Sequence, residues 1–276
     1  MDVEVLKLSA FPNGKNGGNK AGVVVDANSL SDVDMQSIAK NVGFSETAFV
    51  LKSNKADYRI RYFTPTREVD ICGHATIATF NALRDKKILK KGTYTFETRV
   101  GVLNIEVGKT DVFMEQMHPI FFETVDEFEI YDCFYEERFV NKEMPIKIVS
   151  TGLREIFVPV KDVEALNKLH PKLKNITYLS EKYNVIGIHL FALDDKVDAY
   201  GRNFAPAFGI DEESATGTSN GALACYLNKY HSPTKTDYVL RQGYSMDMPS
   251  EISVKLTKHL TEILTVRVGG TAKLLK

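Results

Sequence analysis

RYFTPTREVDICGHATIATFNAL, residues 61–83, begins as a β-type run and changes to a helical pattern at Gly73. A second stretch, RNFAPAFGIDEESATGTSNGALACYL at 202–227, follows the same plan. Both have Arg-x-Phe-x-Pro, an acidic linker, a glycine that opens a helix, alanine five residues after that glycine and leucine ten after it. A matched phenylalanine precedes each stretch, at Phe49 and Phe191. We interpret the chain as one structural unit repeated at an offset of about 140 residues.

The repeated glycines, Gly73 and Gly217, each stand where a helix is predicted to begin. The first N–H groups of a helix have no partner within the helix and carry the positive end of its dipole. Two such helix ends, each with a glycine that allows close approach to the backbone, would bind a substrate carboxylate or an enolate. The alternative is that each glycine only eases a tight turn from strand to helix.

Short strands with β-branched residues and near alternation dominate the rest of the chain. We expect strands at 3–11, 22–26, 47–51, 58–63, 93–98, 102–107, 112–116, 147–150, 156–160, 187–193, 197–202, 252–255 and 264–269. We expect helices at 32–42, 73–86, 163–169 and 218–230, where Ala, Leu and Met recur at three- and four-residue spacing. This ratio of strands to helices does not suit a regular βαβ alternation and predicts an α+β fold in which sheets wrap a few buried helices.

Composition predicts a globular protein whose partner is a small molecule. The 276 residues are 43% hydrophobic, and the formal net charge of −1 gives no reason to expect a nucleic acid or an anionic membrane as partner. The start, MDVEVLKLSAF, lacks the features of a signal peptide, and no run of about 18 apolar residues follows. We therefore expect a cytoplasmic protein, with Cys72, Cys133 and Cys225 reduced.

The order and spacing of several motifs resemble the PhzF-like (phenazine-biosynthesis) family, which shares the diaminopimelate-epimerase fold. The motifs are GFSETAFV, FTPTREVDICGHATIA, RNFAPAFGIDEESATGTSNGALACYL, QGYSMDMPSEISV and VRVGGTAKLL, which together span nearly the whole chain. The resemblance implies two pseudo-symmetric domains, each a β-barrel-like sheet around a central helix, with the active site in the cleft between them. We expect halves at 1–117 and 118–276, with the last strand able to pack back on the first half. It also implies isomerisation by proton transfer without a cofactor, on a small carboxylate-bearing metabolite, and commonly a homodimer.

The same resemblance assigns roles to individual residues. The catalytic carboxylate of the family falls on Glu46, the active-site histidine on His74, and a second acidic residue on Glu213. At a helix N-terminus a neutral imidazole is favoured, so His74 suits positioning or a secondary proton relay. Substrate-binding positions fall on Ser45, Gly73, Gly217 and Thr218. Without the family, Glu46 would be taken as a solvated surface residue, and Ser45 as a turn or cap hydroxyl.

This chain departs from the family pattern where the second acidic residue lies. Many relatives have Asp-Pro where this chain has Glu213-Ser214, so the carboxylate is kept on a longer side chain, by about 1.5 Å. Met248 stands where relatives often carry Arg, and Lys20 where they often have Pro. These departures bear on the ligand more than on the fold.

No metal is predicted, because Cys72 and His74 are adjacent potential ligands without a second cluster of ligand spacing. Two other classes of function remain open. One is a protein that binds a small metabolite without catalysis. The other is an epimerase or racemase that depends on Cys72, which is disfavoured because the position opposite, Thr216, offers no second thiol.

Overall fold

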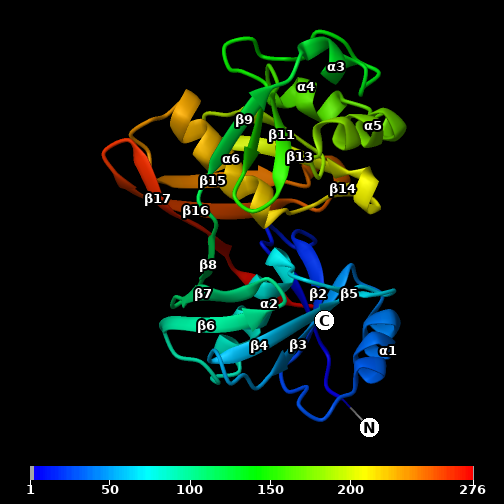
Figure 1. Cartoon of the computed structure of the whole chain (residues 1–276), viewed down its shortest axis with the longest axis vertical. Coiled ribbons are helices and arrows are strands. Elements are labelled where there is room, and N and C mark those ends of the chain that lie inside the picture. Colours follow the sequence, from blue (N-terminus) through cyan, green and yellow to red (C-terminus); the bar gives the residue numbers. More distant parts are fainter. Residues whose placement is uncertain (1–2, 276) are drawn as a thin grey trace. The chain divides into compact units, whose positions relative to one another are not determined.

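The computed structural model describes residues 3–275, which divide into two compact units. Of the described residues, unit 1 comprises 3–115 and 269–275 and unit 2 comprises 116–268, so the segment after 268 belongs to the first unit. Figure 1 shows strands throughout both units and few helices, and the predicted α+β class is confirmed. Within 3–275, no helix is long and apolar enough to span a membrane.

Unit 1 is a sheet built around one buried helix. Its elements are β1 (Leu6–Ala10), β2 (Asn19–Val24), α1 (Asp32–Val42), β3 (Glu46–Leu51), β4 (Tyr58–Phe63), β5 (Glu68–Val69), α2 (Gly73–Asp85), β6 (Gly92–Thr98), β7 (Gly101–Val107), β8 (Val112–Gln116, which ends in unit 2) and β18 (Ala272–Leu274). The strands pair in the order β18–β1–β2–β3–β4–β6–β7–β8, with β5 also on β4. The pairs β2–β3 and β4–β6 are parallel and the others are antiparallel.

Unit 2 has a larger set of helices around a sheet of the same plan. Its elements are β9 (Ile120–Thr124), α3 (Glu127–Tyr131), β10 (Lys147–Ser150), β11 (Arg154–Pro159), α4 (Val163–Lys168), α5 (Leu173–Tyr183), β12 (Ile188–Leu193), β13 (Ala199–Ala205), the short helix η1 (Pro206–Phe208), β14 (Ile210–Glu213), α6 (Gly217–Tyr230), β15 (Asp237–Gln242), η2 (Tyr244–Met246), β16 (Ser250–His259) and β17 (Glu262–Gly270, which ends in unit 1). The order β9–β10–β11–β12–β13–β15–β16 contains the parallel pairs β11–β12 and β13–β15, with β14 antiparallel on β13. The pairings from β1 to β7 therefore recur from β10 to β16.

The central helices are buried on nearly all sides. Every residue of α2 from His74 to Leu83 is buried, and so is every residue of α6 from Ser219 to Asn228. A helix enclosed by a sheet can carry polar residues when they bond to its own backbone. Thr76 and Thr79 do so, since each hydroxyl donates to the carbonyl four residues earlier.

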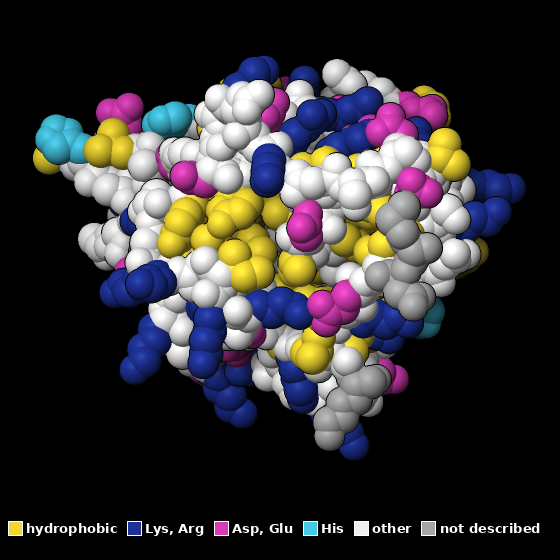
Figure 2. All heavy atoms as spheres, turned by 90° about the horizontal axis from the view of Figure 1, so that it is seen from below, with side chains coloured by type: hydrophobic (Ala, Val, Ile, Leu, Met, Phe, Trp, Pro, Cys, Tyr) yellow, Lys and Arg dark blue, Asp and Glu magenta, His cyan; other side chains and the backbone are white. Residues whose placement is uncertain are grey.

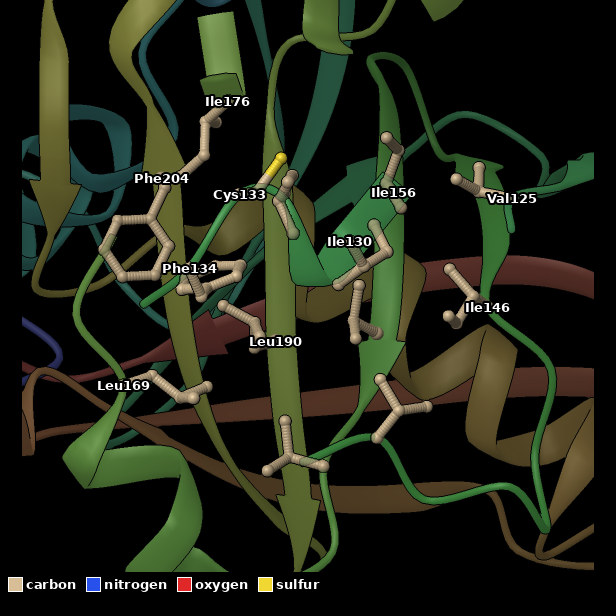
Figure 3. Close-up of a cluster of buried hydrophobic side chains, with 14 of the residues drawn as sticks. Val125, Ile130, Cys133, Phe134, Ile146, Ile156, Leu169, Ile176, Leu190 and Phe204 are labelled. Atoms are coloured by element: carbon tan, nitrogen blue, oxygen red, sulfur yellow. The ribbon is translucent and has the colours of Figure 1, made fainter. Parts of the chain in front are cut away.

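The core of unit 2 lies between its sheet and the helices α3, α4 and α5. Figure 3 shows apolar side chains from α3, α5 and β11–β13, and from the segments beside them, packed together, among them Ile130, Leu190 and Phe204. Burial of a side chain of this size stabilises the fold by about 1.5–3 kcal/mol relative to exposure. In unit 1 a smaller apolar group, including Met35 and Phe49, holds α1 to the sheet.

The surface carries charges of both signs. Figure 2 shows one face on which Lys, Arg, Asp and Glu side chains lie around a group of hydrophobic side chains, with Lys and Arg prevailing at the lower left. Over the whole sequence the two signs nearly balance, with a formal net charge of −1.

Most predicted elements are present, and the differences have local causes. The strands at 58–63, 112–116 and 147–150 and the helix at 32–42 have the predicted bounds. The predicted strand at 3–11 is shorter, at Leu6–Ala10. The sequence analysis missed α3, α5, β5, β9, β14, β15 and β18, whose runs are short or mix polar residues with apolar ones. That the chain forms two barrel-like domains, with the boundary between 117 and 118, stays a prediction.

Candidate active site

Parallel pairing of β2 and β3 gathers the candidate residues of unit 1 at one end of the sheet. Ala21 lies opposite Glu46, so Asn19 and Glu46 stand where both strands begin. In parallel strands the amino ends lie at the same edge. Gly73 and His74 open α2 at this edge. The chain thus brings a carboxylate, an amide and an imidazole together from three elements.

His74 lies at the centre of this group with its side chain 5% exposed. At its Nδ1 atom, Asn19 Nδ2 lies at 3.2 Å and Cys72 Sγ at 3.4 Å. At its Nε2 atom, Ser45 Oγ lies at 3.4 Å and Glu46 Oε2 at 3.3 Å. Because an amide N–H donates to Nδ1, the neutral ring carries its proton on Nε2, on the side of Glu46.

Glu46 is held beside the imidazole while one of its oxygens stays uncommitted. Its side chain is 17% exposed, and Oε2 is buried without a hydrogen bond among the described residues. His74 Nε2 is close enough to Oε2 to stabilise its negative charge, but the two are not aligned as a hydrogen bond. This oxygen therefore has a free lone pair in a site that is mostly shielded from water.

The start of α2 is suited to receive a ligand. Cys72, the N-cap residue, has φ −143° and ψ 115° and makes no side-chain capping bond. The orphan N–H groups of the first turn therefore have no side-chain acceptor from this cap. A Cβ added to Gly73 would meet no atom closer than 3.9 Å, and Gly73 lies outside the left-handed region. Neither packing nor the turn requires glycine here, which disfavours the interpretation that Gly73 only eases a turn.

Unit 2 presents its acidic candidate in a different way. Thr216, the N-cap residue of α6, donates its hydroxyl to Glu213 Oε2 at 2.6 Å. Gln242 of β15 donates to the Glu213 carbonyl at 2.6 Å, and its side-chain oxygen accepts from the Thr216 backbone N–H at 3.1 Å and from Asn220 Nδ2 at 2.7 Å. Asn220 and Gln242 are fully buried. The turn that carries Glu213 is therefore fixed by a buried amide pair.

Behind this turn lies a second buried polar group. Asn203, which pairs with Glu213 across β13 and β14, donates to Glu155 and also contacts Ser219 and His189. Burial raises the pKa of Glu155 to about 7, hydrogen bonds from Ser219 and Asn203 oppose this, and the charge of Glu213 adds to it. Burial lowers the pKa of His189 to about 3, so this ring is neutral at physiological pH.

The structure places Gly73, His74, Gly217 and Thr218 at the start of the two buried helices, and Ser45, Glu46 and Glu213 on or beside strands of the same units. Unit 1 brings together Ser45, Glu46, Gly73 and His74, and unit 2 has Glu213 just before α6, whose first residues are Gly217 and Thr218. The catalytic and binding roles of these residues stay predictions.

Several polar residues of the site escaped the sequence analysis. Asn19 and Glu155 lie outside the motifs quoted from the sequence, and Gln242 opens the motif QGYSMDMPSEISV, for which no role was predicted. Only Glu155 could have been found from the sequence, because it is a charged residue next to the apolar run IFVPV. Charged residues are rarely buried unless they have a partner.

The cysteines divide into one that contacts the candidate site and two that do not. None of the three is in a disulfide. Burial raises the pKa of both Cys133 and Cys225 to about 12, so both are thiols at neutral pH and lack nucleophilic reactivity.

Comparison with known proteins gives matches over nearly the whole chain. The family model described as "Phenazine biosynthesis-like protein" (PhzC-PhzF) matches residues 8–276. The uncharacterized isomerase YfhB of Bacillus subtilis is 32% identical over 98% of this chain and 96% of its own length. Trans-2,3-dihydro-3-hydroxyanthranilate isomerase of Pseudomonas chlororaphis is 28% identical over 95% of this chain and 94% of its own. The crystal structure of a PhzF-family phenazine biosynthesis protein of Bacillus anthracis superposes with a TM-score of 0.91 at 34% identity, covering 100% of this chain and 98% of that one.

Proposed function

Because this chain belongs to the PhzC-PhzF family of phenazine biosynthesis-like proteins, we propose that it is an isomerase that moves a proton on a small carboxylate-bearing metabolite. Glu46 is the principal acid and base. The observation that carries this proposal is the buried Oε2 atom of Glu46, which accepts no hydrogen bond among the described residues and lies 3.3 Å from His74 Nε2. A carboxylate oxygen in this state can take a proton from carbon.

The proposed reaction needs one carboxylate and a place for negative charge. Glu46 removes a proton from a C–H bond of the substrate and becomes a carboxylic acid, while the electron pair of that bond enters the conjugated system as an enolate. The proton on the Glu46 carboxylic acid exchanges with solvent, Glu46 then gives a proton to another carbon, and the double bond has moved. No oxidant, reductant or cofactor enters this balance.

The start of α2 supports the charged intermediate. Backbone N–H groups after Cys72 have no side-chain cap and lie at the positive end of the helix dipole. Gly73 leaves room for a substrate oxygen to approach them. His74 Nε2–H and the Ser45 hydroxyl, 3.4 Å apart, supply further donors beside Glu46.

The residues of unit 2 have supporting roles in this proposal. Glu213 orients the substrate or assists proton transfer, and Gly217 and Thr218 supply a backbone and a hydroxyl donor at the start of α6. That both sets of residues act on one substrate remains a prediction, as do a homodimeric state and a cytoplasmic location. Light scattering of the purified protein tests the dimer.

Deuterium exchange tests the central role of Glu46. The protein is incubated in deuterated water first with trans-2,3-dihydro-3-hydroxyanthranilate, the substrate in the name of the Pseudomonas relative, and then with a metabolite extract. We expect mass spectrometry to find a compound that is isomerised and gains deuterium. We expect Glu46→Gln to abolish both, since an amide cannot accept the proton.

A matched control separates this role from general damage. Glu4→Gln changes an exposed carboxylate that pairs with Lys86, and it should leave turnover unchanged. Undiminished turnover by Glu46→Gln would show that Glu46 is not the acid and base of the reaction. A ligand that binds wild type and Glu46→Gln equally, and never gains deuterium, would favour a binding protein without catalysis.

A thiol-dependent epimerase is the second candidate, and one contact favours it. Cys72 Sγ lies 3.4 Å from His74 Nδ1, a distance at which an imidazole can take the thiol proton. In the proposed isomerase Cys72 takes no part in the reaction, so Cys72→Ala retains its turnover. Loss of turnover in a folded Cys72→Ala variant would replace the carboxylate mechanism with the thiol one.

A further inference from the structure

Three side chains of unit 1 combine the donor atoms that zinc prefers. Cys72 offers a sulfur, His74 a ring nitrogen and Glu46 a carboxylate oxygen, and these atoms lie within 4.8 Å of one another. Thiolate, imidazole and carboxylate are the ligands of Zn²⁺ in proteins, and three of them with one open position is a common arrangement. The three residues come from β3 and from the start of α2, so the sequence separates them and the fold unites them.

Two of the three distances between these atoms come close to those of a tetrahedral ion. With metal bonds of about 2.0–2.3 Å, neighbouring donors of a tetrahedral zinc ion are about 3.3–3.7 Å apart. Glu46 Oε2 lies 3.3 Å from His74 Nε2, and Cys72 Sγ lies 3.8 Å from the same nitrogen. Sγ is nearer to Nδ1, at 3.4 Å, so binding requires the thiol to turn toward Nε2.

The surroundings support a metal on Nε2. A histidine that binds a metal through one nitrogen normally donates its other ring N–H to an acceptor that fixes the ring. The Asn19 amide lies 3.2 Å from Nδ1 and presents its oxygen there when it turns over. Glu46 Oε2 already lacks a hydrogen bond among residues 3–275, so a cation displaces none from it. The Glu46 side chain is 17% exposed, so this part of the group is in contact with solvent.

We infer that Glu46, Cys72 and His74 form a binding site for a thiophilic divalent cation such as Zn²⁺, and that the cation inhibits the enzyme. Binding converts the Cys72 thiol to a thiolate and releases its proton to solvent. The ion occupies the oxygen that the proposed reaction needs as base, so it acts as an inhibitor and not as a cofactor. The inhibition rests on the proposed function, whereas the binding does not.

Cobalt spectroscopy and calorimetry test the site directly on tag-free, chelator-treated, reduced protein. We expect one equivalent of Zn²⁺ to bind, and Co²⁺ to give a near-ultraviolet band from thiolate-to-metal charge transfer together with the visible bands of a tetrahedral ion. We expect Cys72→Ala to lose the ultraviolet band and to bind Zn²⁺ at least about tenfold more weakly, and Asn19→Ala to weaken binding about tenfold. Cys225→Ala, a change at a cysteine buried in α6, is the matched control and should retain both signals.

Three outcomes overturn the inference. They are absence of Zn²⁺ binding, bound Co²⁺ without the thiolate band in the wild type, and wild-type affinity in a Cys72→Ala variant whose circular dichroism is unchanged. The outcome with Co²⁺ is measured on wild-type protein, so it would overturn the inference even if the Cys72→Ala variant misfolds. Wild-type protein that shows the thiolate band but no isomerase activity would leave the metal site standing and remove the proposed function. Active protein that is insensitive to Zn²⁺ would overturn the inferred inhibition and leave the proposed function standing.

Discussion

The carboxylate of Glu46 faces an imidazole in unit 1, whereas the carboxylate of Glu213 accepts a hydroxyl from Thr216 in unit 2. Both lie next to the start of a buried helix whose N-cap side chain makes no capping bond. The oxygen of Glu46 near the imidazole accepts no hydrogen bond within residues 3–275, while Glu213 Oε2 accepts a short one of 2.6 Å. The two units therefore share a scaffold but differ in whether the carboxylate oxygen already accepts a hydrogen bond.

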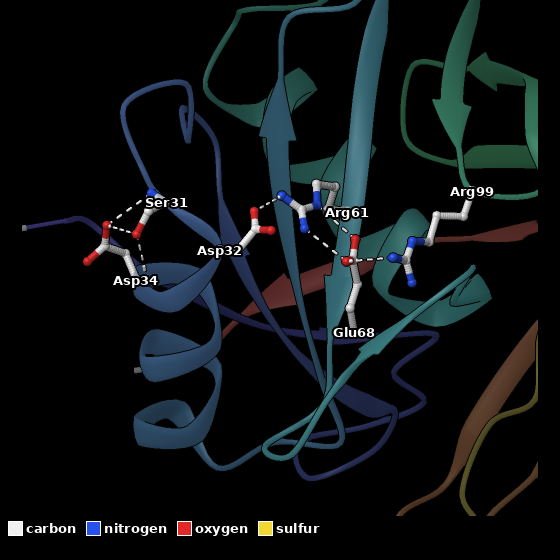
Figure 4. Close-up of polar contacts among 6 residues, drawn as sticks. All are labelled: Ser31, Asp32, Asp34, Arg61, Glu68 and Arg99. Atoms are coloured by element: carbon white, nitrogen blue, oxygen red, sulfur yellow. Dashed lines mark hydrogen bonds and ion pairs between the residues drawn. The ribbon is translucent and has the colours of Figure 1, made fainter.

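The shared scaffold includes an arginine that holds the strand leading to each helix. Arg61 donates through two nitrogens to Glu68 of β5, as Figure 4 shows, and Arg202 does the same to Glu212 of β14. Arg61 has a further partner in the exposed Asp32. Arg202, with a side chain only 7% exposed, instead donates to the carbonyls of the segment 166–169. The Arg-x-Phe-x-Pro repeat of the sequence thus marks two equivalent ion pairs in different surroundings.

The largest difference between the units should appear in turnover. We expect Glu46→Gln to lower kcat by a factor on the order of 10²–10⁴, the contribution of a positioned acid or base. Glu213→Gln should lower kcat only about tenfold, because the Glu213 oxygen already accepts a hydrogen bond from Thr216 and a Gln oxygen can accept the same bond. Steady-state kinetics on both variants measure the contrast. Equal losses would show that the two carboxylates share the proton transfer, and the assignment of Glu46 as principal base would be wrong.

The second contrast concerns the two arginine pairs. We expect Glu212→Gln to lower the free energy of unfolding by about 3–5 kcal/mol, because it leaves the buried Arg202 without a counter-charge. Glu68→Gln should cost less, because Arg61 keeps Asp32. Urea denaturation of both variants, followed by circular dichroism, gives the comparison. A larger cost for Glu68→Gln would mean that Asp32 does not compensate Arg61 and that the pair in unit 1 contributes more to stability than the pair in unit 2.

The third contrast concerns Glu155, the buried carboxyl group of unit 2. No carboxyl group in the described part of unit 1 has a pKa raised in this way. The folded state keeps Glu155 protonated up to about pH 7, whereas the unfolded chain releases this proton near the ordinary value of about 4.3. The stability that Glu155 contributes is therefore present below about pH 4.3 and is lost as the pH rises through 7. Between pH 4 and pH 8, the free energy of unfolding of Glu155→Gln should rise by roughly 3 kcal/mol relative to that of wild type.

His189 acts in the opposite direction and makes the test specific. Its lowered pKa of about 3 means that its contribution is lost as the pH falls below about 6.5. In wild type the opposite pH dependences of stability that arise from Glu155 and His189 nearly cancel between about pH 4.5 and 6.5. In Glu155→Gln only the dependence from His189 remains, so the melting temperature should rise with pH in this range. If the melting temperatures of wild type and variant change with pH in the same way, Glu155 is not protonated in the folded state.

How far the sequence could predict these features depends on whether a residue lies in a local pattern. The starts of α2 and α6 and the bounds of β4 follow from periodicity and from a glycine at a fixed place, which are local signals. The environment of His74 depends on Asn19, which reaches it from 55 residues away through the parallel pairing of β2 and β3. Gln242 fixes Thr216 across 26 residues in the same way. Such contacts arise from strand register, which one sequence does not specify.

The smallest expected effect separates the role of a glycine in the fold from its role in binding. Gly73→Ala adds a methyl group with no neighbour closer than 3.9 Å and no positive φ to strain it, so the free energy of unfolding should stay within about 0.5 kcal/mol of wild type. If a substrate oxygen approaches the backbone there, the methyl group stands in its way, and KM should rise about tenfold with a smaller change in kcat. Gly187→Ala in unit 2 is the contrasting control, because its methyl group would meet the Phe204 carbonyl oxygen at 1.9 Å and should destabilise the fold without regard to substrate. An unchanged KM in a stable Gly73→Ala protein would show that no ligand comes close to this end of α2, and the anion site would then have to rest on α6 alone.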